Sequence, residues 1–246
     1  DQERLRRTQR FWSAALLRCF LFSLLATIGL HIPGLIDEWT LGSLFALLKT
    51  NIGISWIGSM GLSIAGFYFL HKRKAFDTAW IVLLLAAESI NGHAAAFGAP
   101  IRTVVVDWVH LLAASLWAGG LLYFFVHRRK HQKYAVQFLP RFSRAAFISI
   151  AVLIVTGTGI TLTFLPNPKY IFHSQWGYLL IAKTVLVLFV IAVGAAIRRR
   201  MKKKREPEIG LLLKLDITLM LLIVCITGVF TFLNPIPENR PLSWHE

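Results

Sequence analysis

Long apolar runs separated by short polar stretches recur along almost the whole chain. Each run has roughly 20 residues or more, the length that a helix needs to cross a hydrocarbon core about 30 Å thick. No long polar stretch divides them, so the pattern predicts an all-α, polytopic transmembrane bundle of about seven membrane helices that forms one domain over residues 1–246. The predicted segments are residues 11–31, 41–70, 76–97, 102–127, 144–165, 176–197 and 209–233.

The expected breaks between these segments are short. Pro33-Gly34, Gly98-Ala99-Pro100 and Pro166-Asn167-Pro168 each interrupt an apolar run, and Asn234-Pro235 follows the last one. Proline and glycine end helices because one lacks an N–H group and the other adds backbone freedom. We expect the basic stretch 128–141 to be a loop as well.

Composition supports an integral membrane protein: 56% of the residues are hydrophobic and only 16% are charged, which is unusual for a soluble domain. The net charge of +15 does not indicate nucleic-acid binding, because the basic residues lie in clusters between apolar runs. Placing alternate loops on opposite sides collects 20 of the 27 Lys and Arg residues on one side. The positive-inside rule then predicts a cytoplasmic N-terminus and an outward C-terminus.

The two cysteines and the first residue of the chain limit the interpretation further. Cys19 and Cys225 lie in apolar runs without Cys-x-x-Cys spacing, so we expect small buried apolar residues rather than a disulfide framework or a thiolate metal site. The chain starts at Asp1 without Met or a signal-peptide pattern, which is compatible with a fragment of a longer chain.

The candidate site lies around the turn between the third and fourth segments. His93 and His110 are expected at matching depth near the outer side, on neighbouring helices whose axes pack about 8–10 Å apart. Two inward-pointing imidazoles can share one ion, and imidazole suits copper, zinc and haem iron. Asp107, one turn before His110, could ligate the ion or, as we prefer, accept the proton of a histidine ring nitrogen. The alternative is that both histidines are packing residues.

Three other residues form a possible pathway below the histidines. Glu88 and Lys183 are expected near mid-membrane, where a lone charge costs several kcal/mol, so we expect an ion pair or a neutral Glu88. A packing pair and a proton or ion relay both remain open. Met60 carries a thioether that suits Cu(I), although a single Met more often fills a gap in a core.

Asp216, near the inner end of the seventh segment, is interpreted as structural and able to meet Arg144 or Arg198. No Ser, His and acid constellation and no zinc-protease motif occurs in the sequence, so we assign no catalytic residue and expect no enzyme. No nucleotide-binding motif occurs either, which excludes coupling to ATP on this chain.

Several motifs resemble the CopD family of bacterial copper-resistance and copper-uptake membrane proteins. They are GHAAA at 92–96, DWVHLLAASLWAGGL at 107–121, FSRAA at 142–146, TGTG at 156–159, WGYLLIAK at 176–183 and LNPIP at 233–237. The resemblance covers about residues 41–237 and is most specific in the third and fourth segments. Only this resemblance, and not the spacing, points to copper, and it places the family's histidine positions on His93 and His110.

What the resemblance implies is copper transport, usually import, across the bacterial cytoplasmic (inner) membrane, with metal delivered from the exported side by a CopC-like copper-binding protein or domain. Two other functions use the same residues. One is a b-type haem protein with His93 and His110 as axial ligands, although the short turn between their helices leaves little room for a macrocycle. The other is a membrane docking subunit for an exported copper-binding partner.

Overall fold

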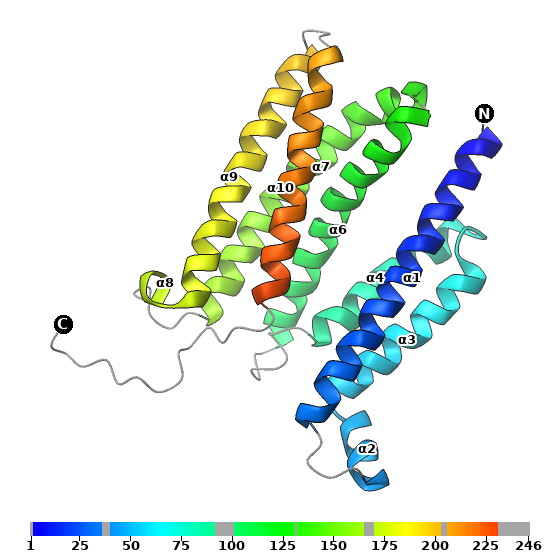
Figure 1. The fold of residues 1–246 in the computed structure, drawn as a ribbon, viewed down its shortest axis with the longest axis vertical. Helices are drawn as coiled ribbons and strands as arrows, with labels where there is room; N and C mark the ends of the chain where they lie inside the picture. The colour runs from blue at the N-terminus through cyan, green and yellow to red at the C-terminus, as the bar shows by residue number, and fades with distance from the viewer. Residues whose placement is uncertain are drawn as a thin grey trace, which may run out of the picture. The chain divides into compact units, whose positions relative to one another are not determined.

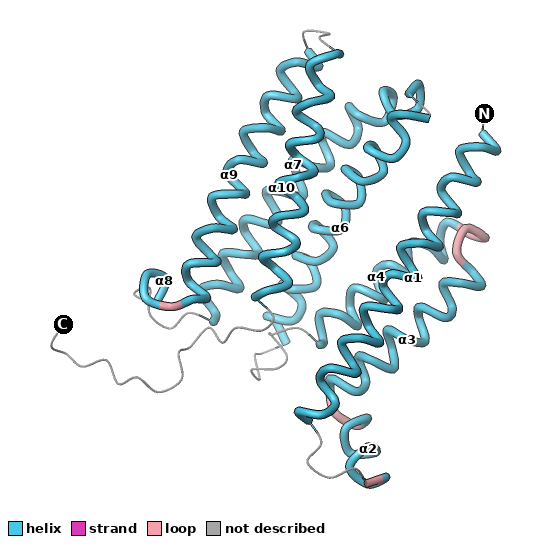
Figure 2. The backbone as a smooth tube through the Cα atoms, in the orientation of Figure 1, coloured by secondary structure: helices cyan, strands magenta, loops and turns pink. Residues whose placement is uncertain are grey.

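The computed structural model describes residues 2–35, 40–91, 101–130, 132–164, 170–202 and 206–230. All of its regular elements within these ranges are helices (Figures 1 and 2), so the all-α polytopic bundle is confirmed. The helices are α1 (Gln2–Leu35), α2 (Leu41–Leu48), α3 (Asn51–Phe69), α4 (Lys74–Asn91), α6 (Ile101–Lys130), α7 (Gln132–Phe164), α8 (Tyr170–His173), α9 (Gln175–Lys202) and α10 (Glu206–Phe230).

Six described helices are long and apolar enough to cross a membrane: α1, α3, α6, α7, α9 and α10. The described part of the predicted third segment is α4, which has 18 residues and carries Lys74, Asp77 and Glu88. It is less apolar than the six for that reason. The total of seven spans and the sides of the two termini therefore stay predictions.

Three predicted boundaries were wrong. α1 continues past Pro33 to Leu35, since a proline this close to a helix end removes only one hydrogen bond. The basic stretch expected as a loop is helical in α6 to Lys130 and in α7 from Gln132, because Arg and Lys are good helix formers. The predicted breaks at residues 98–100, 166–168 and 234–235 lie outside the described residues.

The predicted second segment is two helices rather than one. Thr50 caps the start of α3: its Oγ1 accepts a hydrogen bond from Gly53 N (3.1 Å) and donates one to Leu47 O (2.6 Å). A side chain at Gly53 would overlap the Leu47 carbonyl and the Leu48 backbone. The chain therefore turns sharply between α2 and α3, and a glycine is needed where the two helices meet.

The chain divides into two compact units, Asp1–Leu112 and Ala113–Glu246. In the first, α1, α2 and α3 enclose a small apolar cluster built on Leu24, Leu47 and Trp56. Next to it, α3 and α4 form a hairpin whose turn is closed by Asp77, which accepts a hydrogen bond from His71 N (2.9 Å). His71 has a left-handed φ of 67°. The prediction of a single domain stays a prediction.

The second unit has a larger apolar core. Residues of α6, α7, α9 and α10 meet in it, including Leu121, Phe142, Val190 and Leu213. α9 and α10 run side by side (Figure 1). Arg198 of α9 reaches α7, where its Nη2 donates to Ser143 O (2.7 Å) and its Nε to Ser143 Oγ (3.2 Å).

Large apolar side chains also cover the outside of the candidate spans. Exposed examples are Phe22, Val155, Leu162, Leu188 and Leu221. Such a surface is unfavourable in water and suited to lipid acyl chains. Cys19 and Cys225 are exposed on it too, so the expectation that they are buried was wrong; a thiol is small and weakly polar enough to face lipid.

Adjacent glycines in α6 provide a test of the core. A Cβ at Gly120 would overlap the ring of Phe142, whereas a Cβ at Gly119 would meet nothing within 4 Å. We expect Gly120→Ala to lower the free energy of unfolding by about 1–3 kcal/mol through overpacking. Gly119→Ala should be neutral or stabilising by up to about 1 kcal/mol. Thermal unfolding in detergent measures both, and equal melting temperatures for the two variants would contradict this packing.

Candidate metal site

The structure describes one of the two predicted histidines. His110 and Asp107 lie three residues apart on α6, both half-buried, so they share one face of that helix as predicted. His93 lies outside the described residues. The pairing of His93 with His110 therefore stays a prediction. Among the residues that the structure describes, no group of three or more His, Cys, Asp or Glu side chains could hold a metal ion.

Trp108 fixes the position of this part of α6 against α4. Its Nε1 donates a hydrogen bond to Val82 O (3.1 Å), which is six residues before Glu88 and therefore about 9 Å along α4. The Asp107–His110 turn is thus beside the middle of α4 rather than beside its carboxyl end. The depths of Glu88 and His110 in a membrane stay predictions.

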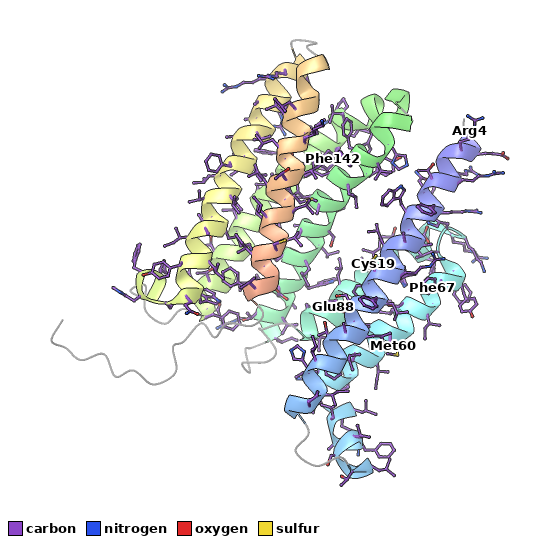
Figure 3. The ribbon with its side chains drawn as sticks, viewed as in Figure 1. Arg4, Cys19, Met60, Phe67, Glu88 and Phe142 are labelled. Carbon is purple, nitrogen blue, oxygen red and sulfur yellow. The ribbon has the colours of Figure 1, made fainter. Side chains whose placement is uncertain are left out.

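Glu88 has a partner on α3. The hydroxyl of Ser59 donates a hydrogen bond to Glu88 Oε1 (2.8 Å), and Figure 3 shows Glu88 on α4 where that helix lies beside α3. One turn away, Ser55 Oγ donates to Ala87 O (2.6 Å). In the other direction Ser63 Oγ donates to Ser59 O (2.7 Å). A polar seam, defined by Ser55, Ser59, Ser63 and Glu88, thus runs along the α3–α4 interface.

The other two pathway residues are placed differently. Met60 of α3 (Figure 3) packs against the apolar cluster of Leu24, Leu47 and Trp56. Lys183, in the second unit, holds its Nζ 5.8 Å from the centroid of the Phe230 ring, a cation–π arrangement. Met60 is therefore not part of the polar seam, and a Glu88–Lys183 pair stays a prediction.

Sequence reasoning missed the serines of the seam. Ser55, Ser59 and Ser63 recur every four residues, a spacing that puts them on one helix face, and all three are buried. The expected contact of Asp216 with Arg198 was also wrong, because the Arg198 guanidinium is engaged by Ser143 and lies 4.9 Å from the Phe147 ring centroid.

Comparison with known proteins locates the family signal in the second unit. Residues 136–232 match the model of the CopD family, copper resistance protein D. This region of the chain is thus similar to the CopD family. The resemblance stated from the sequence is thereby confirmed, although the matched CopD region begins downstream of Asp107 and His110 and thus does not include them.

Two curated relatives extend the similarity beyond this region. Copper transport protein CutJ of Bacillus subtilis (strain 168) is 27% identical over 168 residues, which cover 66% of this chain and 31% of that protein. Inner membrane protein YebZ of Escherichia coli (strain K12) is 26% identical over 226 residues, covering 84% of this chain and 77% of that protein. The chain thus spans about a third of CutJ. No solved structure matches it significantly.

The polar seam can be tested by stability. Ser59→Ala removes the described donor to Glu88 Oε1, and leaving a buried acceptor unsatisfied costs about 1–3 kcal/mol. Ser63→Ala is the matched control, since its hydroxyl bonds a carbonyl of its own helix, and we expect a smaller loss. Thermal unfolding of Ser59→Ala, Glu88→Gln and the double variant should give a coupling energy of at least about 0.5 kcal/mol. Additive effects would show that the Ser59–Glu88 bond does not contribute.

Proposed function

We propose that this protein transports copper ions across the bacterial cytoplasmic membrane, in the inward direction. The CopD match over residues 136–232 carries the proposal, and the name of the Bacillus subtilis relative, a copper transport protein, supports it. The name of the Escherichia coli relative, an inner membrane protein, supports the location. Copper is here the transported substrate rather than a resident cofactor.

The proposed entry site consists of His93 and His110, with Asp107 in support. Asp107 and His110 share a face of α6, so the carboxylate can accept a proton from a histidine ring nitrogen and thereby set which nitrogen faces the ion. Neutral imidazole binds both common oxidation states of copper. The predicted topology puts these residues toward the exported side, where a CopC-like partner would deliver metal.

The polar seam is the proposed continuation of the route in the first unit. Serine hydroxyls and a carboxylate supply oxygen atoms inside a span that otherwise offers an ion nothing to bind. Glu88 is part of the seam. Met60 packs in an apolar cluster instead, so we assign it to packing and not to the route. Because no nucleotide-binding motif occurs in the sequence, an ion gradient or trapping of the metal inside must drive uptake.

Substitution of the site residues tests transport. We expect His110→Ala and His93→Ala each to lower copper binding of the purified protein and copper accumulation by cells at least tenfold, since one of two imidazole ligands is lost. Asp107→Asn should weaken binding by about 10–100-fold, the usual effect of losing a partner of a ligating histidine. Elemental analysis and cell-associated copper measure these effects.

His71→Asn is the matched control, because it removes an imidazole that lies in the basic turn. Asn tolerates the left-handed φ of 67° at that position. It should bind and accumulate copper like the unsubstituted protein. Unchanged binding and uptake in both His93→Ala and His110→Ala would overturn the proposed site. A Soret band in the purified protein that either substitution abolishes would assign the histidines to haem instead.

A further inference from the structure

One carboxylate in the region that matches the CopD family model is buried in a candidate membrane span. Asp216 of α10 is 6% exposed, and its Oδ1 has no hydrogen-bond partner among the described residues. Leu213 and Met220, one turn before and one turn after it, are equally buried and belong to the core of the second unit. The carboxyl group therefore faces apolar side chains within a candidate span.

The charged and titratable groups on the helices that surround this core are occupied elsewhere or exposed. On α9, Arg198 is bound to Ser143 of α7 and Lys183 lies over the Phe230 ring. On α6, the ring of His127 stacks on that of Tyr123, and its Nδ1 lies 2.8 Å from Tyr123 O. Arg141 and Arg144 of α7, Arg199 of α9 and Lys214 of α10 are exposed. Arg200 of α9 is half-buried and engaged in an interaction of its own.

An ionised carboxylate in such a place costs several kcal/mol, whereas the protonated acid costs far less. The stable form in this arrangement of α6, α7, α9 and α10 is therefore the neutral acid. Ionisation requires water or a cation to reach Oδ1, and hence a different packing of α9 and α10. Asp216 lies six residues inside the Gly210–Phe230 span, about 9 Å from its basic end, so the shorter path to water leads to the side predicted as cytoplasmic.

We propose that Asp216 is an intramembrane proton-binding site whose proton is bound when the core of the second unit is closed and released when α9 and α10 separate. The step is the equilibrium of carboxylate and H⁺ with carboxylic acid, and no other reactant takes part. This inference rests on the proposed transport function for its role, which is to couple inward movement of copper to inward movement of protons. The inward movement of protons would then drive copper uptake in place of ATP hydrolysis.

Infrared spectroscopy of the purified full chain tests the proton directly and without reference to copper. The unsubstituted protein at neutral pH should show the carbonyl stretch of a protonated carboxylic acid, shifted in D₂O. Asp216→Asn should remove that band, and Asp216→Glu should move it. Asp77→Asn, which changes a carboxylate at the α3–α4 turn, is the control and should leave the band in place.

Copper accumulation tests the role. Cells with Asp216→Asn should accumulate copper at least tenfold more slowly under an inward proton gradient, with the rate no longer responding to a protonophore, while purified Asp216→Asn still binds copper. Asp216→Glu should retain the response. An absent acid band, or one that is unchanged in both Asp216 variants, overturns the proton site. A band that behaves as expected in a protein without copper uptake overturns the transport function and leaves the proton site standing.

Discussion

A bilayer offers no hydrogen-bond partner to a polar side chain, so each one that enters a span has to find its partner in the protein. Some use a carbonyl of their own helix, as Ser63 does, and others reach a neighbouring helix. This constraint explains the contacts between helices in the first unit. Ser55 and Ser59 of α3 donate to acceptors on α4, Trp80 of α4 donates to Leu62 O on α3 (2.6 Å), and Trp108 of α6 donates to Val82 O. Most of these bonds use a backbone carbonyl, which any neighbouring helix supplies. They fix the rotation and height of one helix against the next.

The fold was largely predictable and the interior was not. Apolar runs long enough to span a bilayer identify helices whatever their neighbours are, because backbone hydrogen bonding in lipid leaves no alternative. The sharp turn between α2 and α3 was not predicted. In the sequence Thr50 and Gly53 are ordinary polar and small residues, and their role depends on the close approach of Leu47, which only the structure shows. Likewise, the basic stretch after α6 was read as a loop from its charge, although Arg and Lys favour helix.

The candidate site was predictable only as a set of residue types. Asp107 and His110 share a helix face because of their spacing, which a sequence displays directly. That Ser59 meets Glu88 depends on which helices are neighbours, and hydropathy does not contain that information. The same holds for Arg198, whose partner Ser143 is 55 positions away. Long-range pairings of this kind require the tertiary arrangement.

The similarity to known proteins and the proposed metal site lie in different units of the chain. The CopD family match falls in the second unit, on α7, α9 and α10, whereas the proposed metal ligands and the polar seam belong to the first. A transporter divided in this way would bind its substrate in one part and carry its buried titratable carboxyl group, Asp216, in the other.

The sharp turn at Thr50, between α2 and α3, also determines how the first unit matches the thickness of a membrane. Because α2 ends there, α3 is limited to 19 residues, or about 28 Å, close to the hydrocarbon thickness of about 30 Å. α1 has 34 residues, about 51 Å, and packs against α3. About 20 Å of α1 must therefore extend beyond the acyl chains or be accommodated by tilt, and its arginine-rich first turns are the part suited to the lipid headgroups. Hydrophobic matching by α3, and not the length of α1, then sets the depth at which this unit sits.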